Sequence, residues 1–215
     1  MPLQLNNTDL AGATTGNPIA LLNRIGYANT TPGGVINGYK RMPVLQAQMS
    51  ATQFFEQVMG ASRLTLVGEV GYNRINGLGE SDGTDLRFGR SGIFGVGVQP
   101  GAANTACLNK TTNPQQECND KGFYTAESWG YRARARLDYP NVFAGINLAP
   151  NLAWSHDVNG NGPNFEEGLK AVSLGLDADY KNTYTASLSY TDFFGGDFNS
   201  NGDRDFVALS VGVNF

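Results

Sequence analysis

Apolar and polar residues alternate along seven segments of the chain, each with a period of two residues. The alternation is cleanest at 123–139, where one face is apolar from Trp129 to Tyr139 and the opposite face carries Arg132, Arg134 and Arg136. A period of two is that of a β-strand with one apolar and one polar face. The pattern predicts strands at 41–53, 63–73, 123–139, 142–155, 169–180, 183–192 and 207–215.

The expected connections between these strands alternate between short and long. Short connections are expected at 54–62, near Pro140-Asn141 and at Lys181-Asn182. Long, polar connections are expected at 74–122, 156–168 and 193–204. The segment 54–62 should form a short helical turn, and Pro150 should introduce a bulge or bend because it has no N–H to donate. Short turns at one end and long loops at the other are typical of bacterial outer-membrane β-barrels.

Composition fits a membrane sheet better than a bundle of membrane helices. Charged residues make up only 16% of the chain, below the ~25% usual in soluble domains. Hydrophobic residues make up 40%, yet no run approaches the ~18 apolar residues that a membrane helix requires. We therefore predict an all-β fold, an antiparallel up-and-down transmembrane β-barrel. Tyrosines on the apolar faces would form its aromatic girdles, namely Tyr72, Tyr139, Tyr180, Tyr184 and Tyr190.

A soluble antiparallel sandwich is the alternative fold, because it would bury two apolar faces against each other. It does not explain why Arg132, Arg134 and Arg136 share one face of a strand whose other face is wholly apolar. It also gives no reason for the difference in loop length between the two ends of the sheet.

The number of strands is odd, whereas single-chain bacterial barrels normally have an even number. Residues 1–40 are expected to form an irregular, loop-rich segment, in which Ile19–Leu22 is a loop helix or a poor eighth strand. Residues 41–215 are expected to form barrel strands with long outer loops, about seven or eight strands in all. We expect the chain to be part of a larger barrel.

The last expected strand carries an apolar row that ends on an aromatic ring. The row consists of Leu209, Val211, Val213 and Phe215. A terminal strand of this kind resembles the signal that the barrel assembly machinery reads in bacterial outer-membrane proteins. We therefore expect this end of the strand to lie at the periplasmic side of the bacterial outer membrane.

Two cysteines, Cys107 and Cys118, lie in one polar stretch of the longest loop. Their spacing is too wide for a C-x-x-C redox motif, and with a single histidine in the chain a zinc site is not expected. We expect a local disulfide in an oxidising compartment, with two free thiols as the alternative. The net charge of −4 leaves no basic surface for nucleic acid, which is not expected as a partner.

Several charged residues are expected to face the interior of the barrel. They are Glu69, Arg132, Arg134, Arg136, Asp138, Asp177 and Asp179. Opposed acidic and basic rows can select ions, as charged pore linings do. In the structural alternative, the same charges pair across strands or with a plug and hold the barrel rigid.

Two loops share the pattern D-x-N-x-N-G, which begins a calcium-binding loop. The glutamate expected at the end of such a loop is replaced by Gly168 in the first loop and by Ala208 in the second. Asx-Gly sequences also occur because they turn tightly. No cofactor is therefore expected, and the remaining calcium candidates are Asp157, Asn159, Asn161, Asp197, Asn199 and Asn201.

The string Ser155-His156-Asp157 contains catalytic residue types. Neighbours on a strand point to opposite faces, so these residues cannot form a triad with one another. The chain is not expected to be an enzyme, and a membrane hydrolase that uses His156 with a distant serine is the remaining enzymatic alternative.

Six local strings resemble one known family. They are Gly38–Val44 leading into Gln46–Gln48, Leu66–Gly71, Leu86–Arg90, Trp154–Gly160, Tyr190–Gly196 and Asp203–Val207. In this order they resemble the C-terminal half of a proteobacterial family catalogued as domain of unknown function thirteen hundred and two. The resemblance covers most of 38–215 and implies a large outer-membrane barrel whose N-terminal half this chain lacks.

The resemblance also implies a function. In genomic setting the family is similar to export systems that pair an inner-membrane permease of the resistance-nodulation-division class with a periplasmic partner. This implies transport or export of small, hydrophobic molecules across the outer membrane, with outer-membrane lipid and the assembly machinery as further partners. The alternative is a structural or surface-binding barrel with a plugged lumen that acts through its extracellular loops.

Overall fold

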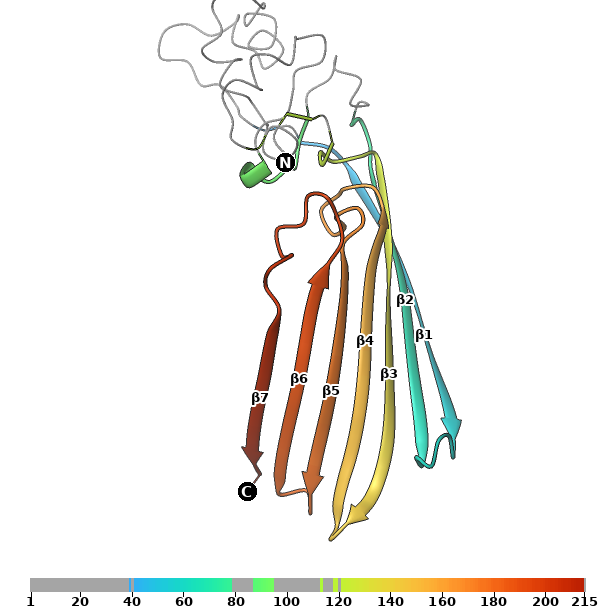
Figure 1. Cartoon of the computed structure of the whole chain (residues 1–215). Coiled ribbons are helices and arrows are strands. Elements are labelled where there is room, and N and C mark those ends of the chain that lie inside the picture. The colour runs from blue at the N-terminus through green and yellow to red at the C-terminus, as the bar shows by residue number, and fades with distance from the viewer. Residues whose placement is uncertain are drawn as a thin grey trace, which may run out of the picture. The chain divides into compact units, whose positions relative to one another are not determined.

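A computed structural model describes Tyr39 and residues 41–78, 87–94, 113, 118–119 and 121–214. Within these residues the chain is all-β, with one seven-stranded sheet in which each strand lies beside its neighbour in sequence (Figure 1). The strands are β1 (Val44–Glu56), β2 (Arg63–Ile75), β3 (Glu127–Phe143), β4 (Ile146–Asn159), β5 (Lys170–Tyr180), β6 (Tyr184–Phe194) and β7 (Phe206–Val213). The prediction of an antiparallel, up-and-down all-β fold is confirmed.

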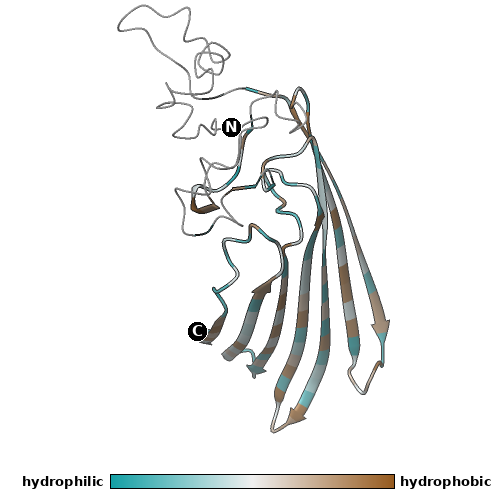
Figure 2. Cartoon of the chain, turned by 45° about the horizontal axis from the view of Figure 1, so that its top comes forward, coloured by the Kyte–Doolittle hydropathy of each residue, from teal (hydrophilic) through white to brown (hydrophobic). Residues whose placement is uncertain are grey.

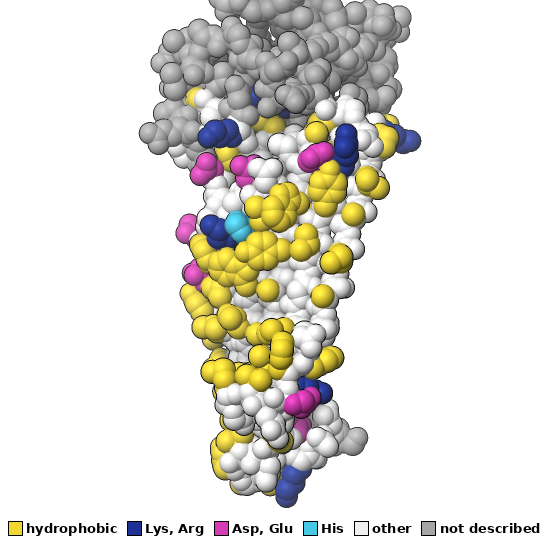
Figure 3. Space-filling view, turned by 90° about the vertical axis from the view of Figure 1, so that its right-hand side faces the viewer, with side chains coloured by type: hydrophobic (Ala, Val, Ile, Leu, Met, Phe, Trp, Pro, Cys, Tyr) yellow, Lys and Arg dark blue, Asp and Glu magenta, His cyan; other side chains and the backbone are white. Residues whose placement is uncertain are grey.

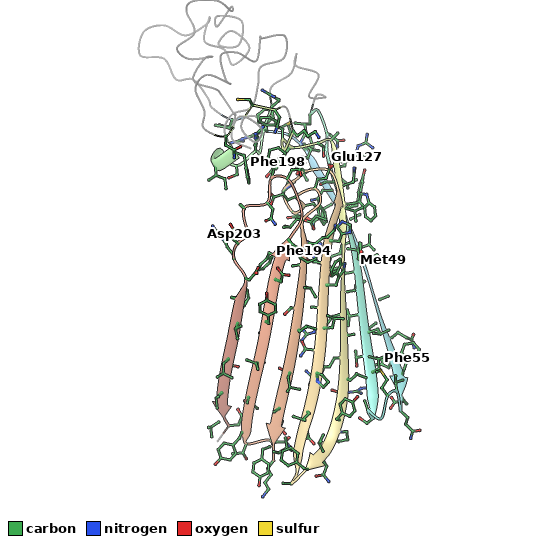
Figure 4. The ribbon with its side chains drawn as sticks, viewed as in Figure 1. Met49, Phe55, Glu127, Phe194, Phe198 and Asp203 are labelled. Carbon is green, nitrogen blue, oxygen red and sulfur yellow. The ribbon has the colours of Figure 1, made fainter. Side chains whose placement is uncertain are left out.

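The sheet is open within the described residues, with β1 and β7 as its two edge strands. Figure 4 shows Met49 and Phe55 along β1, where both side chains are exposed. The one helical segment described is a short 3-10 helix, η2 (Gly92–Phe94). Among the described residues, no helix has the length and apolar character needed to cross a membrane.

The chain divides into two compact units. One contains Gln46–Tyr72, Trp129–Asn159 and Phe165–Phe215, and the other contains Met1–Leu45, Asn73–Ser128 and Gly160–Asn164. In the second unit Phe88, Phe94 and Phe123 are buried. The buried Arg90 guanidinium donates to the backbone carbonyls of Asn119 and Lys121, both at 2.9 Å. This unit therefore has a small core of its own.

The three short connections lie together at one end of the sheet, and the described part of β7 finishes beside them (Figure 1). The β1–β2 connection, 57–62, is a tight turn closed by a hydrogen bond from Gln57 N to Ser62 O and is not helical. Gln57, Met59 and Gly60 all have positive φ there, so the predicted helical turn was wrong. The β5–β6 connection adds Thr183 to the predicted Lys181-Asn182 turn.

The β3–β4 turn differs from the prediction. It lies at Ala144-Gly145, where φ is +50° and +85°, the sign that two-residue hairpins require at both positions. The chain stays in β3 through Pro140, and one irregularity in the β3–β4 register falls between Tyr139 and Phe143. The predicted bulge at Pro150 was wrong, because the pairing of β4 with β5 runs without interruption through this residue.

Hydropathy alternates along the strands, as Figure 2 shows by its bands of contrasting colour. Side chains from neighbouring strands line up in rows across the sheet. One row joins Leu152, Leu174, Tyr190 and Val207 and is apolar, and the next joins Ala153, Ser173, Thr191 and Phe206. Tyr190 thus pairs with Leu174 within the strand and lies away from the strand end, unlike Tyr180 and Tyr184, which pair at the end of the β5–β6 hairpin.

Candidate functional site on the polar face of the sheet

The two faces of the sheet differ in chemistry. We call the polar face the side that carries Arg132, Arg134 and Arg136, and the apolar face the side that carries Leu152 and Leu174. Glu69, Asp138, Asp177 and Asp179 lie on the polar face with the arginines, as their shared cavities and cross-strand partners show. The alternation in the sequence thus brings the seven charged candidates onto one surface.

Near the short turns, the charges form a continuous network. Arg136 Nε donates to Asp138 Oδ1 at 3.0 Å, and Arg63 Nη2 lies 3.2 Å from the other oxygen of the same carboxylate. Arg136 Nη1 reaches across to Asp177 Oδ2 at 3.1 Å. Two guanidinium groups therefore bind two carboxylates that come from non-adjacent strands, β3 and β5.

Neutral polar groups complete this network. Asp177 Oδ1 accepts a hydrogen bond from Ser187 Oγ at 2.7 Å, and Asp177 Oδ2 accepts one from Asn151 Nδ2 at 3.2 Å. Asn147 Nδ2 donates to Asp179 Oδ1 at 3.3 Å. A cavity of about 450 Å³ borders these groups. The network spans β2 to β6 and leaves its carboxylates well paired, which rigidifies this end of the polar face.

The middle of the polar face is different, because two of its charged side chains, Arg134 and Glu69, form no ion pair among the described residues. Arg134 and Glu69 line a second cavity of about 270 Å³, together with Arg132, Ser155 and Ser173. Arg134 is exposed, and among the described residues it forms no ion pair. This guanidinium is therefore available to a solute on the polar face.

At the opposite end of the strands from the short turns, the β4–β5 connection folds back onto the polar face. Arg132 Nη2 and Asp157 Oδ1 lie 2.9 Å apart, and only 3% of Asp157 is exposed. Asp157 Oδ2 accepts from the backbone N–H of Glu166 at 2.9 Å. The backbone of Asp157 also binds Gly168 and Leu169. One buried aspartate thus holds both the arginine and the returning chain.

Phe165 lies in the same fold-back and is 9% exposed. Its ring lies under the Arg132 guanidinium, 5.7 Å from ring centroid to Cζ. A Cβ atom at Gly71 would lie 2.9 Å from the ring, and one at Gly130 would lie equally close. Because these two glycines have no side chain, the Phe165 ring has room to lie against the polar face and cover part of it. We call residues 165–169 the latch segment.

Glu166, in the latch segment, has a pKa above its usual range. Burial raises the pKa of its carboxyl, and the nearby negative charge of Asp157 raises the pKa further. Burial and a neighbouring like charge both disfavour the ionised form.

Of the calcium candidates, Asp157 and Asn159 lie at the end of β4, and the other four lie in connections between strands. Both oxygens of Asp157 already have partners, and Asn199 forms an Asx turn in which its Oδ1 accepts from Asn201 N at 2.7 Å. Asn161 binds Thr125 through its backbone. No group of three or more His, Cys, Asp or Glu side chains is arranged to hold a metal within the described residues. Figure 4 shows Phe198 and Asp203 in the loop that carries the second pattern.

The remaining candidates are the apolar row of β7, the two cysteines, and Ser155 with His156. Leu209, Val211 and Val213 are exposed on the apolar face of β7, and Phe215 lies outside the described residues. Cys118 is buried, but Cys107 also lies outside the described residues, so their disulfide stays a prediction. Ser155 and His156 point to opposite faces, because they pair with Arg132 and Tyr131 respectively.

Sequence reasoning did not name Arg63, Phe165, Asn151 and Ser187 among the candidate site residues. The alternation in the second segment placed Arg63 on the same side as Glu69, which is a signal that could have found it. Phe165 lies in the connection between β4 and β5, where no periodic pattern indicates which way a side chain points.

Comparison with known proteins gives one match. A family model described as protein of unknown function (DUF1302) matches residues 1–215. No curated protein and no solved structure matches the chain.

Proposed function

Since the chain belongs to the DUF1302 family of proteins of unknown function, we propose a function from its own two-faced sheet. We propose that it is an outer-membrane β-barrel, or part of one, that moves small molecules across the bacterial outer membrane. The apolar face contacts lipid, and the polar face lines the passage.

One observation carries this proposal, the exposure of the apolar face. Leu174 is 57% exposed, Leu209 is 72% exposed and Val211 is 75% exposed. Figure 3 shows hydrophobic side chains over much of the side of the sheet that it displays, with most charged side chains toward the two ends. Apolar surface on this scale is unfavourable in water and favourable in a bilayer.

The spacing of aromatic residues agrees with a membrane of ordinary thickness. Tyr180 stacks on Tyr184 at one end of the β5–β6 pair, with ring centroids 6.3 Å apart. Trp154 contacts Phe194 near the other end, with ring centroids 5.9 Å apart. Phe194 pairs with Lys170, ten residues from Tyr180 on β5. This is about 33 Å of strand, or about 25 Å along the membrane normal at the usual tilt, which matches the apolar band of known barrels.

The polar face supplies what a passage needs. Its network near the short turns keeps partly exposed carboxylates paired, while Arg134 and Glu69 at the middle cavity form no ion pair among the described residues. Unpaired charges in a narrow lumen select solutes by sign. Partners expected with such a role are the barrel assembly machinery, a periplasmic protein and an inner-membrane permease.

A plugged barrel that acts through its loops is the second candidate. The latch segment favours it, because Phe165 covers part of the polar face and the Arg132–Asp157 pair holds it there. Conductance separates the two functions, since a plugged barrel inserts in a bilayer without forming an open pore.

The test uses the full chain refolded into planar lipid bilayers. Discrete conductance steps are expected, and Arg134→Gln should shift their selectivity toward cations. Lys170→Gln is the matched control, because it removes the same charge from the apolar face and should leave selectivity unchanged. Insertion without conductance would support the plugged barrel, and a failure to insert would overturn both functions.

A further inference from the structure

A basic pair stands out on the apolar face. His156 on β4 and Lys170 on β5 are direct cross-strand partners, so their side chains leave the sheet side by side. Figure 3 shows the one histidine of the chain beside a basic side chain, with largely hydrophobic side chains around them. Neither residue forms an ion pair within the described part of the chain.

Aromatic side chains frame this pair. The Tyr131 ring meets the His156 ring edge to face, with centroids 5.6 Å apart. Trp154 Nε1 donates to the Tyr131 hydroxyl at 3.2 Å, and Phe194 pairs directly with Lys170. Figure 4 shows Phe194 near the end of β6 that leads into the β6–β7 loop. The frame thus fixes the positions from which His156 and Lys170 present their nitrogens.

The same face also carries the carboxyl group of Asp192. Asp192 lies in the row next to that of Lys170, and the neighbouring Asp205 accepts from the Tyr190 hydroxyl at 3.5 Å. Asp205 also accepts from the backbone N–H of Phe193 at 3.2 Å. Neither residue of the basic pair forms an ion pair with a carboxylate in the described part of the chain, so both offer donors to an anion that approaches from the lipid side.

Position decides which anion this is. The row of Lys170 and Phe194 lies about 25 Å along the membrane normal from the row of Tyr180 and Tyr184, at the depth where lipid headgroups meet the apolar band. Basic groups at headgroup depth bind lipid phosphates. Lysine is a common phosphate ligand, and charge-assisted bonds of this type are strong.

We propose that His156 and Lys170 form a binding site for the phosphate of an anionic membrane lipid, in the leaflet on the side of the long loops. The acyl chains of that lipid lie against the apolar face at Leu152 and Leu174, and Tyr131, Trp154 and Phe194 border its headgroup. This lipid site rests on the proposed function, which places the protein in a membrane. It adds to that proposal the class of lipid that the protein binds.

The experiment titrates the full chain, refolded in detergent micelles, with phosphatidic acid or with phosphatidylcholine of the same acyl chains. Trp154 fluorescence reports binding in a Trp129→Phe background. Phosphatidic acid should bind at least about tenfold more tightly, as expected for charge-assisted bonds to phosphate. The double variant His156→Gln/Lys170→Gln should lose most of this preference.

Lys181→Gln is the matched control, because Lys181 contacts the Tyr180 ring at the other end of the sheet. It should keep the full preference for phosphatidic acid. Inorganic phosphate at the same concentration should not compete, since a headgroup site also needs the acyl chains. An unchanged preference in the double variant, or competition by free phosphate, would overturn the lipid site.

Failure of this site is distinguishable from failure of the proposed function. Vesicles of brominated phosphatidylcholine quench tryptophans that face the bilayer. Quenching without any preference for phosphatidic acid would reject the lipid site alone. An absence of quenching would reject the membrane location itself, and with it the lipid site.

Discussion

Arg132 and Asp157 form an ion pair between adjacent strands, with 2.9 Å between Nη2 and Oδ1, at the point where the latch segment returns to the sheet. The carboxylate is nearly inaccessible, while 42% of the arginine side chain is exposed. Asp157 also binds the backbone of Glu166, Gly168 and Leu169. The pair therefore couples the order of the latch segment to one charge on the polar face.

Replacing Arg132 should loosen the latch segment. In Arg132→Gln the buried Asp157 loses its cation, and an unsatisfied buried acceptor costs about 1–3 kcal/mol. Faster amide hydrogen exchange is expected at 165–169, with the strands unchanged. Arg134→Gln is the control, because Arg134 has no ion pair among the described residues. Equal protection of 165–169 in both variants would show that the pair does not hold the segment.

Gly71 should tolerate a side chain poorly, although it lies in an open sheet. In Gly71→Ala the new Cβ would lie 2.9 Å from the Phe165 ring, so the ring has to move. We expect a loss of about 1 kcal/mol or more, the lower range for overpacking, and easier proteolysis at 165–169. Gly68 on the same strand has nothing within 4 Å of its Cβ position, so Gly68→Ala should be neutral or stabilising. Identical melting curves for the two variants would contradict the packing of Phe165.

The alternation in the sequence predicted the strands and their faces, because successive side chains of a strand point to opposite sides of the sheet. It could not predict partners such as Arg63 and Asp138, since shifting one strand by two residues keeps each face but changes every pair. The β3–β4 turn was misplaced for a related reason. Pro140-Asn141 and Ala144-Gly145 are both able to turn, and only the pairing of Phe143 with Ile146 selects the second. Phe165 escaped prediction because connections have no periodicity.

The two faces of β5 should respond differently to a charge. Leu174 is exposed in the middle of the apolar face, and an arginine at the bilayer midplane of a barrel costs about 2–4 kcal/mol. Ser173 lies next to it on the polar face, where its hydroxyl accepts from Thr191 Oγ1. Urea unfolding from lipid vesicles should therefore show a large loss in Leu174→Arg and a much smaller loss in Ser173→Arg. Equal losses would mean that the apolar face does not contact lipid.

Acidic pH should stabilise the latch segment through Glu166. Burial and Asp157 raise the pKa of this carboxyl above its unfolded value, so the folded segment binds its proton more tightly than the unfolded segment does. Stability from this group is complete below the ordinary glutamate pKa of about 4.3, and it is lost as pH rises through the raised pKa. Hydrogen exchange at 165–169 should accordingly quicken over this interval, after correction for the intrinsic pH dependence of exchange. Glu166→Gln carries no charge at any pH, so it should remove this dependence and protect the segment at neutral pH. If the dependence survives in Glu166→Gln, another group controls the latch segment.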